Sequence, residues 1–546
     1  MLPPPGFRGV FRSDERARAA YAEAAGIYRI LPSAVCLPAD TADIALLVRW
    51  AAEGRIPLVP RGAGSAMGGG NVGDGIVVDL TRLPPRLGVR PEERVAETGA
   101  NITLADLNGA ADRHGLRLPP DPSSGRWATL GGMVSTNAAG ARSVRYGSVR
   151  RWVRAVELVT VDGDLLTLRR GEPAPSVPAV SRFEADAAPA IRAATETIGR
   201  RFPRTRKNAS GYALDEYLAS GDLLDLVIGS EGTLGIVTAV EWRLDPVPAH
   251  RAGLRIGLRS LDDLVRVVAA LLMHEPSAVE LLDRTFLDLV RDTDAGTGLG
   301  DAEALLLVEL ERAEPAALRA AVLAAADAVR DRAASVDTAL SARAAERLWA
   351  VRHAASPLLA RLPEERRSLQ VIEDACLPIE RMGDYIRTVR RLAAVRGIPV
   401  VVFGHAGDGH VHVNLLPEVA RAGWEGAVAT LLDEVSEAVV RLGGTPSGEH
   451  GDGRLRAGLL ARVYGEEIVD LFRAVKRAFD PLGILAPGVI LPSGEPPISR
   501  LKVGPGAAAL PPDIARALRD IERKGGYGRC RMDLAGERVE GRGSRV

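Results

Sequence analysis

The sequence predicts an α+β protein with two main domains. The chain of 546 residues is longer than one ordinary domain, and its 46% hydrophobic content is sufficient for large cores. From about residue 40 to 245, short β-like runs alternate with helical patterns around glycine-rich loops, which leaves an α/β arrangement open for this part. A second region starts near "DPVPAHRAGLRIGL". We expect domains over 1–245 and 246–466, a helix and loop over 467–496 that return to the first domain, and a partly ordered tail over 497–546.

The elements of the first region follow from periodicity and from turn residues. "PADTADIALLVRWAAEGR" opens with an Asp/Thr cap and carries its apolar residues on one helical face. "IPLVP", "GIVVDL" and "RVAETGA" predict strands, and "TLADLNGAADRHG" predicts a helix that ends at Gly115. "AVELVTVDGDLLTL" predicts a hairpin with an Asp-Gly turn at 162–163. "LLDLVIGSEGTLGIVTAVEWRL" then predicts an apolar run, a glycine loop and an alternating strand.

The second region predicts helices with a strand and two polar loops between them. We expect a long Ala-rich helix over about 315–334, a strand at "PVVVFG" and a helix near 425–442. The strand runs into "GHAGDGHVHVN" (404–414), and the later helix is followed by the loop "SGEHGDGR". A last helix, "EEIVDLFRAVKRAFDP", precedes a tail rich in Gly, Pro and charge.

Composition excludes several classes of function and cellular location. Lys+Arg and Asp+Glu both number 70, so no charge excess indicates nucleic acid or an anionic membrane as a partner. Cys36, Cys376 and Cys530 are too few for a disulfide scaffold or a four-cysteine iron–sulfur cluster. No apolar run resembles a signal peptide or a membrane span. We therefore expect a cytoplasmic protein, or one peripheral to a membrane through a partner.

The segment "VPRGAGSAMGGG" (59–70) holds five glycines, which allow backbone N–H groups to approach a phosphate closely. A Rossmann loop would continue into a helix, whereas this loop continues into the strand-like "NVGDGIVVDL". The pattern predicts a diphosphate clamp between two strands. A flexible surface loop is the alternative that this segment alone leaves open.

Three further segments of small residues follow the glycine loop. They are "PPDPSS" with "ATLGGMVSTNAAGARSVRYGSV" (119–149), "RKNASGYALDEY" (206–217) and "GSEGTLGIVT" (229–238). In this order, the segments resemble the flavin domain of vanillyl-alcohol-oxidase-like flavoproteins, and more closely the FAD-dependent D-2-hydroxyacid dehydrogenases, over about residues 35–490. The resemblance implies a two-subdomain FAD-binding domain and an α/β substrate (cap) domain with an antiparallel sheet. The FAD contacts that it implies are Pro60, Arg61, Gly62, Ala63, Gly64, Ser65, Gly69, Pro122, Gly131, Gly132, Asn137, Ala139, Gly140, Glu231, Gly232, Gly235, Ile236 and Val237. Since residues 59–70 contain no histidine to tether the flavin, we expect non-covalent FAD.

The chain has eight histidines, and half of them fall in the two polar loops. Alternation along the strand after the turn places His410, His412 and Asn414 on one face, and a four-residue turn can bring His405 beside it. Two imidazoles and the acid Glu449 suit one divalent metal, with zinc expected and manganese or iron as alternatives. Hydrogen-bonded histidines at a domain interface are the other reading.

The resemblance implies roles for these side chains. It implies His405, His412 and Glu449 as metal ligands and His450 as the catalytic base. Relatives usually have asparagine where this chain has His410, so a third imidazole ligand, a substrate contact and no role all stay open for it. Two functions are also open for Asp452, which either orients His450 or caps its loop. Glu373 and Asp374 match an acidic pair found in relatives, without an assigned role.

The expected reaction is the oxidation of a D-2-hydroxy acid to the 2-oxo acid, as in D-lactate, glycolate and 2-hydroxyglutarate dehydrogenases. The expected substrate contacts are Arg352, its neighbour Ser356, Asn414 and Arg367, which stands near the position where relatives often carry a lysine. A separate electron acceptor is expected: an iron–sulfur subunit, an electron-transfer flavoprotein, a quinone or a cytochrome. The alternatives are a non-redox flavin enzyme similar to alkyl-glycerone-phosphate synthase and a non-catalytic flavoprotein subunit.

Overall fold

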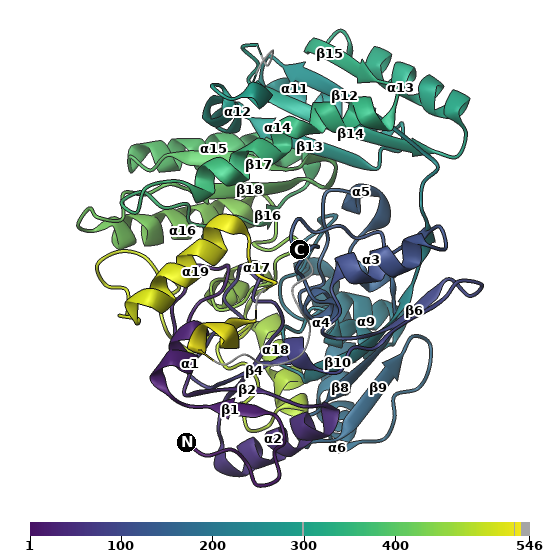
Figure 1. The fold of residues 1–546 in the computed structure, drawn as a ribbon. Coiled ribbons are helices and arrows are strands. Elements are labelled where there is room, and N and C mark those ends of the chain that lie inside the picture. Colours follow the sequence, from purple (N-terminus) through teal and green to yellow (C-terminus); the bar gives the residue numbers. More distant parts are fainter. Residues whose placement is uncertain (297–299, 529, 537–546) are drawn as a thin grey trace.

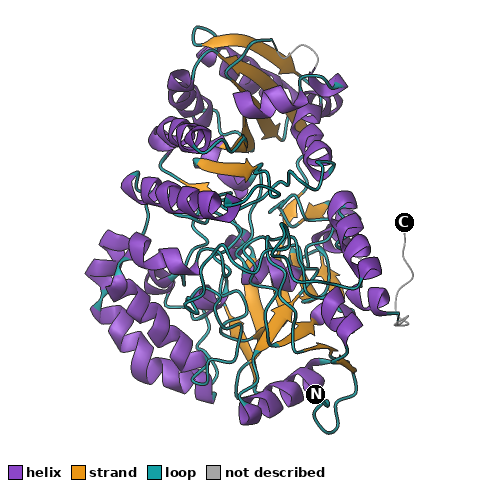
Figure 2. Cartoon of the chain, turned by 90° about the vertical axis from the view of Figure 1, so that its left-hand side faces the viewer, coloured by secondary structure: helices purple, strands orange, loops and turns teal. Residues whose placement is uncertain are grey.

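The computed structural model describes residues 1–296, 300–528 and 530–536 (Figure 1). The predicted α+β class is confirmed, because the larger sheets are mostly antiparallel and helices flank them. In Figure 1 a seven-stranded sheet lies above a four-stranded and a five-stranded sheet. Figure 2 shows that loops gather between these two halves. Among the described helices, none is both long and apolar enough to cross a membrane.

The four-stranded sheet carries the glycine loop between two of its strands. Its order is β1 (Val10–Arg12), β2 (Ala34–Leu37), β4 (Ile76–Asp79) and β3 (Leu58–Arg61), and β2, β4 and β3 run parallel. Helices α1 (Glu15–Ala20) and α2 (Thr41–Gly54) accompany it. The predicted cap of α2 is confirmed, since the Asp40 side chain accepts the N–H of Asp43. The loop after β3 returns into β4, which confirms the strand–loop–strand arrangement.

The five-stranded sheet is antiparallel and forms the core of the lower half. Its order is β5 (Leu87–Arg90), β6 (Val95–Gly99), β10 (Ile236–Arg243), β8 (Val153–Val159) and β9 (Leu165–Arg169). The predicted hairpin is β8–β9, and β7 (Leu116–Arg117) pairs with β11 (Asp245–Pro246). The helices of this half are α3 (Leu104–Asp112), α4 (Leu130–Ser135), α5 (Ser143–Tyr146), α6 (Pro178–Arg182), α7 (Ala188–Ala193), α8 (Thr195–Arg201), α9 (Leu214–Ser220) and α10 (Leu224–Val227). From the far end of the chain, α17 (Leu460–Tyr464) and α18 (Glu466–Phe479) share the apolar core of this sheet.

The seven-stranded sheet of the upper half is antiparallel. Its order is β15 (Ala333–Ala339), β12 (His250–Leu258), β14 (Ala304–Arg312), β13 (Ala278–Asp283), β17 (Val400–His405), β18 (His410–Leu415) and β16 (Ala375–Cys376). Its helices are α11 (Leu261–Leu272), α12 (Arg284–Val290), α13 (Pro315–Val329), α14 (Ala342–Ala360), α15 (Met382–Val395) and α16 (Trp424–Arg441). The expected helix over 315–334 ends earlier, because β15 starts at Ala333 and pairs with β12.

Short helical turns connect these elements and include the turn of the histidine hairpin. They are η1 (Leu80–Arg82), η2 (Val149–Arg151), the π-turn η3 (Phe183–Ala187), η4 (Asp294–Gly296), η5 (Ile379–Arg381), η6 (Ala406–Asp408), η7 (Ala457–Leu459) and η8 (Arg531–Ala535). The turn η6 joins β17 to β18, and Gly409 closes it with a φ of 72°. In this register Phe403 pairs with His412 and His405 pairs with His410, so the predicted strand–turn–strand is confirmed.

The segment after residue 496 is more structured than its composition indicated. It contains α19 (Pro512–Lys524), whose buried Ile514, Leu518 and Ile521 form one apolar stripe. The first two of these, with Met532, pack in one core cluster with residues of α1. In Figure 1 this helix lies on the flank of the molecule, and Arg519 reaches Glu364 of the upper half. Residues 537–546 of the expected tail lie outside the described residues.

Candidate active site

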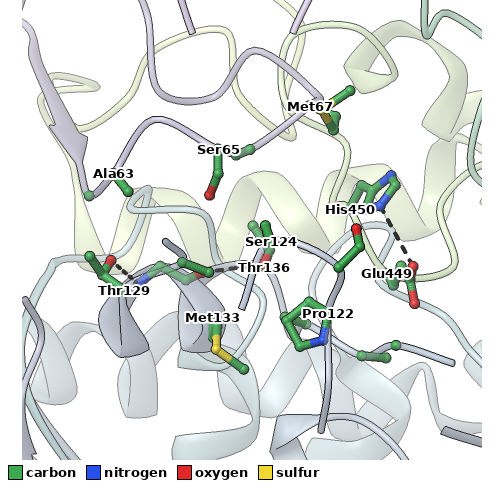
Figure 3. A pocket seen from close by; sticks show the side chains of 18 of the residues that line it. Ala63, Ser65, Met67, Pro122, Ser124, Thr129, Met133, Thr136, Glu449 and His450 are labelled. Atoms are coloured by element: carbon green, nitrogen blue, oxygen red, sulfur yellow. Dashed lines mark hydrogen bonds and ion pairs between the residues drawn. The ribbon is translucent and has the colours of Figure 1, made fainter. Parts of the chain in front are cut away.

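A cavity of about 740 Å³ lies between the glycine-rich loops of the lower half and the histidine hairpin of the upper half. In Figure 3, Ser65 and Met67 lie on one side of it. Thr129 and Met133 of the α4 region lie on the other side, and His450 lies at one end. The cavity is therefore an elongated space bounded by two loop systems that are distant in sequence, and its volume is typical of ligand sites.

Most of the residues expected to bind FAD line this cavity. They are Pro60, Arg61, Gly62, Ala63, Gly64, Ser65, Pro122, Gly131, Gly132, Ala139, Gly140, Glu231, Gly232, Gly235 and Val237. Glycine is required where the loops touch one another, since a Cβ on Gly140 would lie 2.3 Å from the carbonyl oxygen of Asp121. This part of the wall is thus mostly backbone and small side chains. Such walls fit a large flat ligand of the size of a flavin dinucleotide.

Three of the expected FAD contacts do not line the cavity, and one lines it differently from expectation. Gly69 lies under the ring of Tyr28, and Asn137 is buried and accepts a backbone hydrogen bond from Arg150. Ile236 is fully buried in an apolar core because it alternates with Gly235 and Val237 along its strand. The guanidinium of Arg61 donates to backbone carbonyls of residues 21, 23 and 71, so it stabilises the loop from behind.

His405, His412 and Glu449 meet at the upper end of the cavity. Nε2 of His405 lies 3.2 Å from Nε2 of His412 and 3.3 Å from Oε1 of Glu449. Nε2 of His412 lies 3.5 Å from the same carboxylate oxygen. Three ligands of a tetrahedral ion at 2.0–2.1 Å stand about 3.3–3.4 Å from one another, so the three atoms have the spacing of a zinc-like site.

The other polar atom of each ligand is held by a neighbouring group. His405 donates from Nδ1 to Glu280, His412 donates from Nδ1 to the carbonyl of Glu373 at 2.8 Å, and Lys207 donates to Oε2 of Glu449 at 2.8 Å. These bonds fix both imidazole tautomers and leave their Nε2 lone pairs directed at the carboxylate. With both imidazoles in this tautomer, the lone pairs of two nitrogens and one carboxylate oxygen converge, and a cation fits between them.

The carboxylates around His405 favour positive charge at its ring. Burial lowers the pKa of His405, but Glu280 and Glu449 outweigh it and raise that pKa to about 9. The pKa of Glu449 is lowered although burial alone would raise it, because Lys207 and His405 stabilise its charge. The field that favours a proton on Nε2 of His405 equally favours a metal cation at the same place.

His410 belongs to the same cluster of possible ligand side chains as His405, His412 and Glu449, but both of its ring nitrogens are already engaged. Its Nε2 donates to Asp374 at 2.8 Å, and its Nδ1 accepts from Lys207 at 3.3 Å. The side chain is fully buried and does not line the cavity. Burial and then Lys207 lower the pKa of His410 to about 3, so the ring is neutral. His410 therefore acts as a hydrogen-bonded support behind Glu449.

His450 reaches the cavity with one ring nitrogen held by an acid. Nδ1 donates to Oε2 of Glu373 at 2.6 Å, and Nε2 lies 3.6 Å from Oε1 of Glu449. The ring is stacked on that of His412 with centroids 5.3 Å apart. Burial lowers the pKa of His450, but Asp374 and Glu373 outweigh it and raise that pKa to about 10. These acids therefore favour the imidazolium form among the protein's own groups.

Asp452 caps the loop and does not orient His450. Its carboxylate accepts from the hydroxyl of Ser210 and from the N–H of Gly211, both at 2.7 Å. The backbone N–H groups of Asp452 and Gly453 donate to Glu231, which lies on a different loop. The carbonyl of Gly68 accepts the N–H of residue 454 at 2.9 Å. Three glycine-rich loops of the lower half therefore hold the loop that carries Glu449 and His450.

The expected substrate residues divide between two places. Arg352 and Asn414 line the cavity, and Nε of Arg352 donates to Glu280 at 3.0 Å. Arg367 is turned to the molecule's flank, where it pairs with Glu364 and Glu522 at 2.8 Å each, so its expected substrate contact is wrong. The side chain of Ser356 lies outside the described part of the chain.

Sequence reasoning missed three charged residues of the site. Lys207 binds Glu449, and Glu280 binds His405. Glu373, noted in the sequence without a role, contacts His412 and His450. The metal-type ligands are His405, His412 and Glu449. Two signals were present. The chain has only four lysines, and one stands inside a loop of small residues; Glu280 is a lone acid in the apolar run "AVELL" of a buried strand.

Comparison with known proteins agrees with this arrangement. Residues 32–169 match the family described as "FAD binding domain", and residues 247–490 match "FAD linked oxidases, C-terminal domain". The chain is 30% identical to the glycolate oxidase subunit GlcD of Bacillus subtilis, with 84% of this chain and 89% of that protein covered. It is 31% identical to a D-lactate dehydrogenase of Archaeoglobus fulgidus, with 84% and 91% covered. It is 29% identical to the D-2-hydroxyglutarate dehydrogenase of Escherichia coli, of which it covers 51%.

Solved structures with low sequence identity share the fold. The 4-ethylphenol oxidase of Gulosibacter chungangensis superimposes with a TM-score of 0.63 at 16% identity, over 88% of this chain and 94% of that chain. An alkyldihydroxyacetonephosphate synthase superimposes with a TM-score of 0.58 at 16% identity, over 87% and 82%. At this identity the likeness concerns the fold alone.

Proposed function

The chain belongs to the family of FAD-linked oxidases, and from this membership we propose that it oxidises a D-2-hydroxy acid to the corresponding 2-oxo acid. The observation that carries the proposal is the convergence of His405, His412, Glu449 and His450 at one end of the cavity whose walls fit FAD. A non-redox reaction is not favoured, because the synthase resembles this chain at the level of fold only. The convergence of these side chains likewise speaks against a non-catalytic subunit.

Two reactive bonds of the substrate must break in this oxidation. The Cα–H bond loses a hydride, the O–H bond loses a proton, and a C=O bond forms. FAD, when bound, supplies the acceptor for the hydride and its two electrons. In the proposal His450 takes the hydroxyl proton on Nε2, and its Nδ1 stays hydrogen-bonded to Glu373.

His405, His412 and Glu449 would hold one divalent metal, for which Zn²⁺ suits the ligand set and Mn²⁺ or Fe²⁺ are alternatives. The ion would bind the substrate hydroxyl and lower its pKa as a Lewis acid. A cation held by Glu449 would offset one of the acids that raise the pKa of His450. His450 would then be closer to the neutral imidazole that a base requires.

Arg352 is the proposed partner of the substrate carboxylate. Only its Nε is bonded to Glu280, so its terminal nitrogens keep their donors for a bidentate carboxylate contact. The guanidinium lies 4.5 Å from the ring centroid of Phe403, and that ring lies 5.2 Å from the ring of His412. Arg352 is therefore close enough to the metal-type ligands to share one small substrate with them. Asn414, on the same strand face as His412, is a second proposed contact.

The proposed reaction also requires an electron acceptor. Two electrons must leave the flavin after each turnover, and we propose a separate acceptor: an iron–sulfur subunit, an electron-transfer flavoprotein, a quinone or a cytochrome. The proposed location is the cytoplasm, or the surface of a membrane through such a partner.

Anaerobic mixing of the FAD-loaded protein with D- and L-2-hydroxy acids tests the reaction. We expect one or more D-acids to bleach the flavin absorbance. A chelator and the His450→Ala variant should each remove the bleaching, while dithionite still reduces the flavin in both. If dithionite reduces the flavin and none of the acids does, the proposed function is wrong.

A further inference from the structure

One arginine of the cavity wall has its terminal nitrogens available to a substrate. Of the described residues that line it, three are arginines: Arg61, Arg142 and Arg352. Arg61 points to backbone carbonyls behind the glycine loop. Arg142 is saturated, since it donates to Asp121 at 2.5 Å and to both oxygens of Glu309 at 2.7 and 2.8 Å. Arg352 pairs with Glu280 through Nε at 3.0 Å, and no hydrogen bond to a described residue engages its terminal nitrogens.

The other basic side chains near Arg352 are either paired with carboxylates or neutral. Lys207 is buried against Glu449 and does not line the cavity. His353 lines it beside Arg352, but burial and the neighbouring Arg352 lower the pKa of His353, so its ring is neutral at neutral pH. Arg367 lies in a different hollow with Glu364 and Glu522. The imidazoles of His405 and His450 also line the cavity, but they are paired with Glu280 and Glu373. A second carboxylate beside α14 would therefore meet no cation other than Arg352.

The wall beyond Arg352 is neutral. Trp349, Arg352, His353 and Pro357 project from one side of α14, as their spacing along a helix requires. Gln370 also lines the cavity, beside Asn414, because the neighbouring Leu369 pairs antiparallel with Leu415. Aromatic and amide groups of this kind accept an uncharged chain and give no countercharge to an anion.

We propose that the substrate is a 2-hydroxy acid with a single carboxylate and an uncharged side chain, which lies against Trp349, Pro357 and Gln370. This inference rests on the proposed function and narrows it. The α-carboxylate binds Arg352, the α-hydroxyl lies at the metal-type ligands and His450, and the side chain extends along α14. A dicarboxylate would place its second charge in the cavity without a partner, which is unfavourable at a desolvated site.

Three acids of matched length test the inference. They are D-2-hydroxypentanoate, D-2-hydroxyglutarate and the C5 carboxamide of D-2-hydroxyglutarate, which has the shape of the dicarboxylate and one charge fewer. The readout is the second-order rate constant of anaerobic flavin reduction. We expect the pentanoate and the amide to exceed the dicarboxylate by at least about tenfold. An equal or larger rate constant for the dicarboxylate overturns the inference while the proposed function stands, and failure of all three acids together with the wider D-acid panel overturns both.

A pair of variants at Gln370 provides a second test. Gln370→Lys adds a cation to the neutral wall, and Gln370→Met changes the side chain without adding charge. We expect the lysine variant to raise the ratio of dicarboxylate to pentanoate rate constants by at least about tenfold, and the methionine variant to keep the preference for the uncharged side chain. If the lysine and methionine variants give the same ratio, Gln370 does not face the substrate side chain and the inference is wrong.

Discussion

Glu373 and His450 form a hydrogen bond of 2.6 Å between a buried carboxylate and Nδ1 of the imidazole. The backbone carbonyl of the same glutamate accepts from Nδ1 of His412 at 2.8 Å. Its second carboxylate oxygen pairs with the buried guanidinium of Arg456. One residue therefore fixes the orientation of the proposed base and of one proposed metal ligand, and its charge is balanced from behind.

Glu373→Gln should lower the rate of flavin reduction by about 10–100-fold, the range typical for the loss of a supporting partner in a metal site. The amide keeps the size of the side chain but no longer holds the Nδ1 proton of His450 with a charged acceptor. We expect the loss in kcat with a smaller change in KM, because Arg352 still binds the carboxylate. Stopped-flow reduction by a substrate acid, with bound FAD quantified, measures it. The exposed Glu365→Gln variant is the control, and equal rates in the two variants would contradict the positioning role.

His412→Asn should abolish metal binding, whereas His410→Asn should retain it. Both histidines lie on the same strand face, two residues apart, but only His412 presents a free Nε2 to His405 and Glu449. The nitrogens of His410 are engaged by Asp374 and Lys207. Elemental analysis of the purified proteins gives the metal content per chain. Loss of the metal from the His410 variant together with retention in the His412 variant would reverse the assignment.

Lys207→Met should destabilise the protein by about 3–5 kcal/mol, because it leaves the buried carboxylate of Glu449 without its cation. Urea unfolding of the metal-depleted protein measures the free-energy difference, since a metal would itself offset that charge. Lys524→Met is the matched control, as its ammonium group is exposed and 3.5 Å from Asp520. We expect a change within about 0.5 kcal/mol there. Equal effects of the two substitutions would show that the pair with Glu449 contributes nothing to stability.

Glu522 should make the attachment of α19 sensitive to acid. Burial raises its pKa, but Lys502, Arg367 and Arg519 outweigh burial and lower the pKa to about 2. A carboxyl with a depressed pKa stabilises the folded state above its ordinary pKa near 4.5, and this stabilisation disappears as the pH falls toward 2. The difference in unfolding free energy between the wild type and Glu522→Gln should therefore be present at pH 6, at most roughly 3 kcal/mol, and shrink toward zero near pH 2.

Chemical denaturation at several pH values measures that difference, and limited proteolysis after residue 496 reports on the segment itself. Asp520→Asn, on the exposed side of the same helix, serves as the control. A difference that grows as the pH falls would contradict the assigned direction of the pKa shift.

Local patterns were sufficient for much of the fold. The caps and periods of the helices, the Asp-Gly hairpin and the strand–turn–strand around His405 depend on neighbours within a few residues, so the sequence predicted them. The apolar stripe of α19 was also local, but the polar composition around it concealed it. Many helices were not predicted, including α11, α12, α14 and α15 of the upper half. Among the shorter ones, α6 to α8 have alanines and charges that give no strong period.

The sequence by itself determined the α+β class, the glycine loop between strands, and four side chains of the site: His405, His412, Glu449 and His450. Only the tertiary structure decided their partners. The pair of Lys207 and Glu449 joins residues 242 positions apart, and the pair of Arg367 and Glu522 joins residues 155 positions apart. Alternation tells which face of a strand a side chain occupies, but not which distant loop packs against that face. That choice depends on the burial of the whole core. The sequence therefore could not show that His410 binds Asp374, that Glu373 binds His450, or that Arg367 lies outside the cavity.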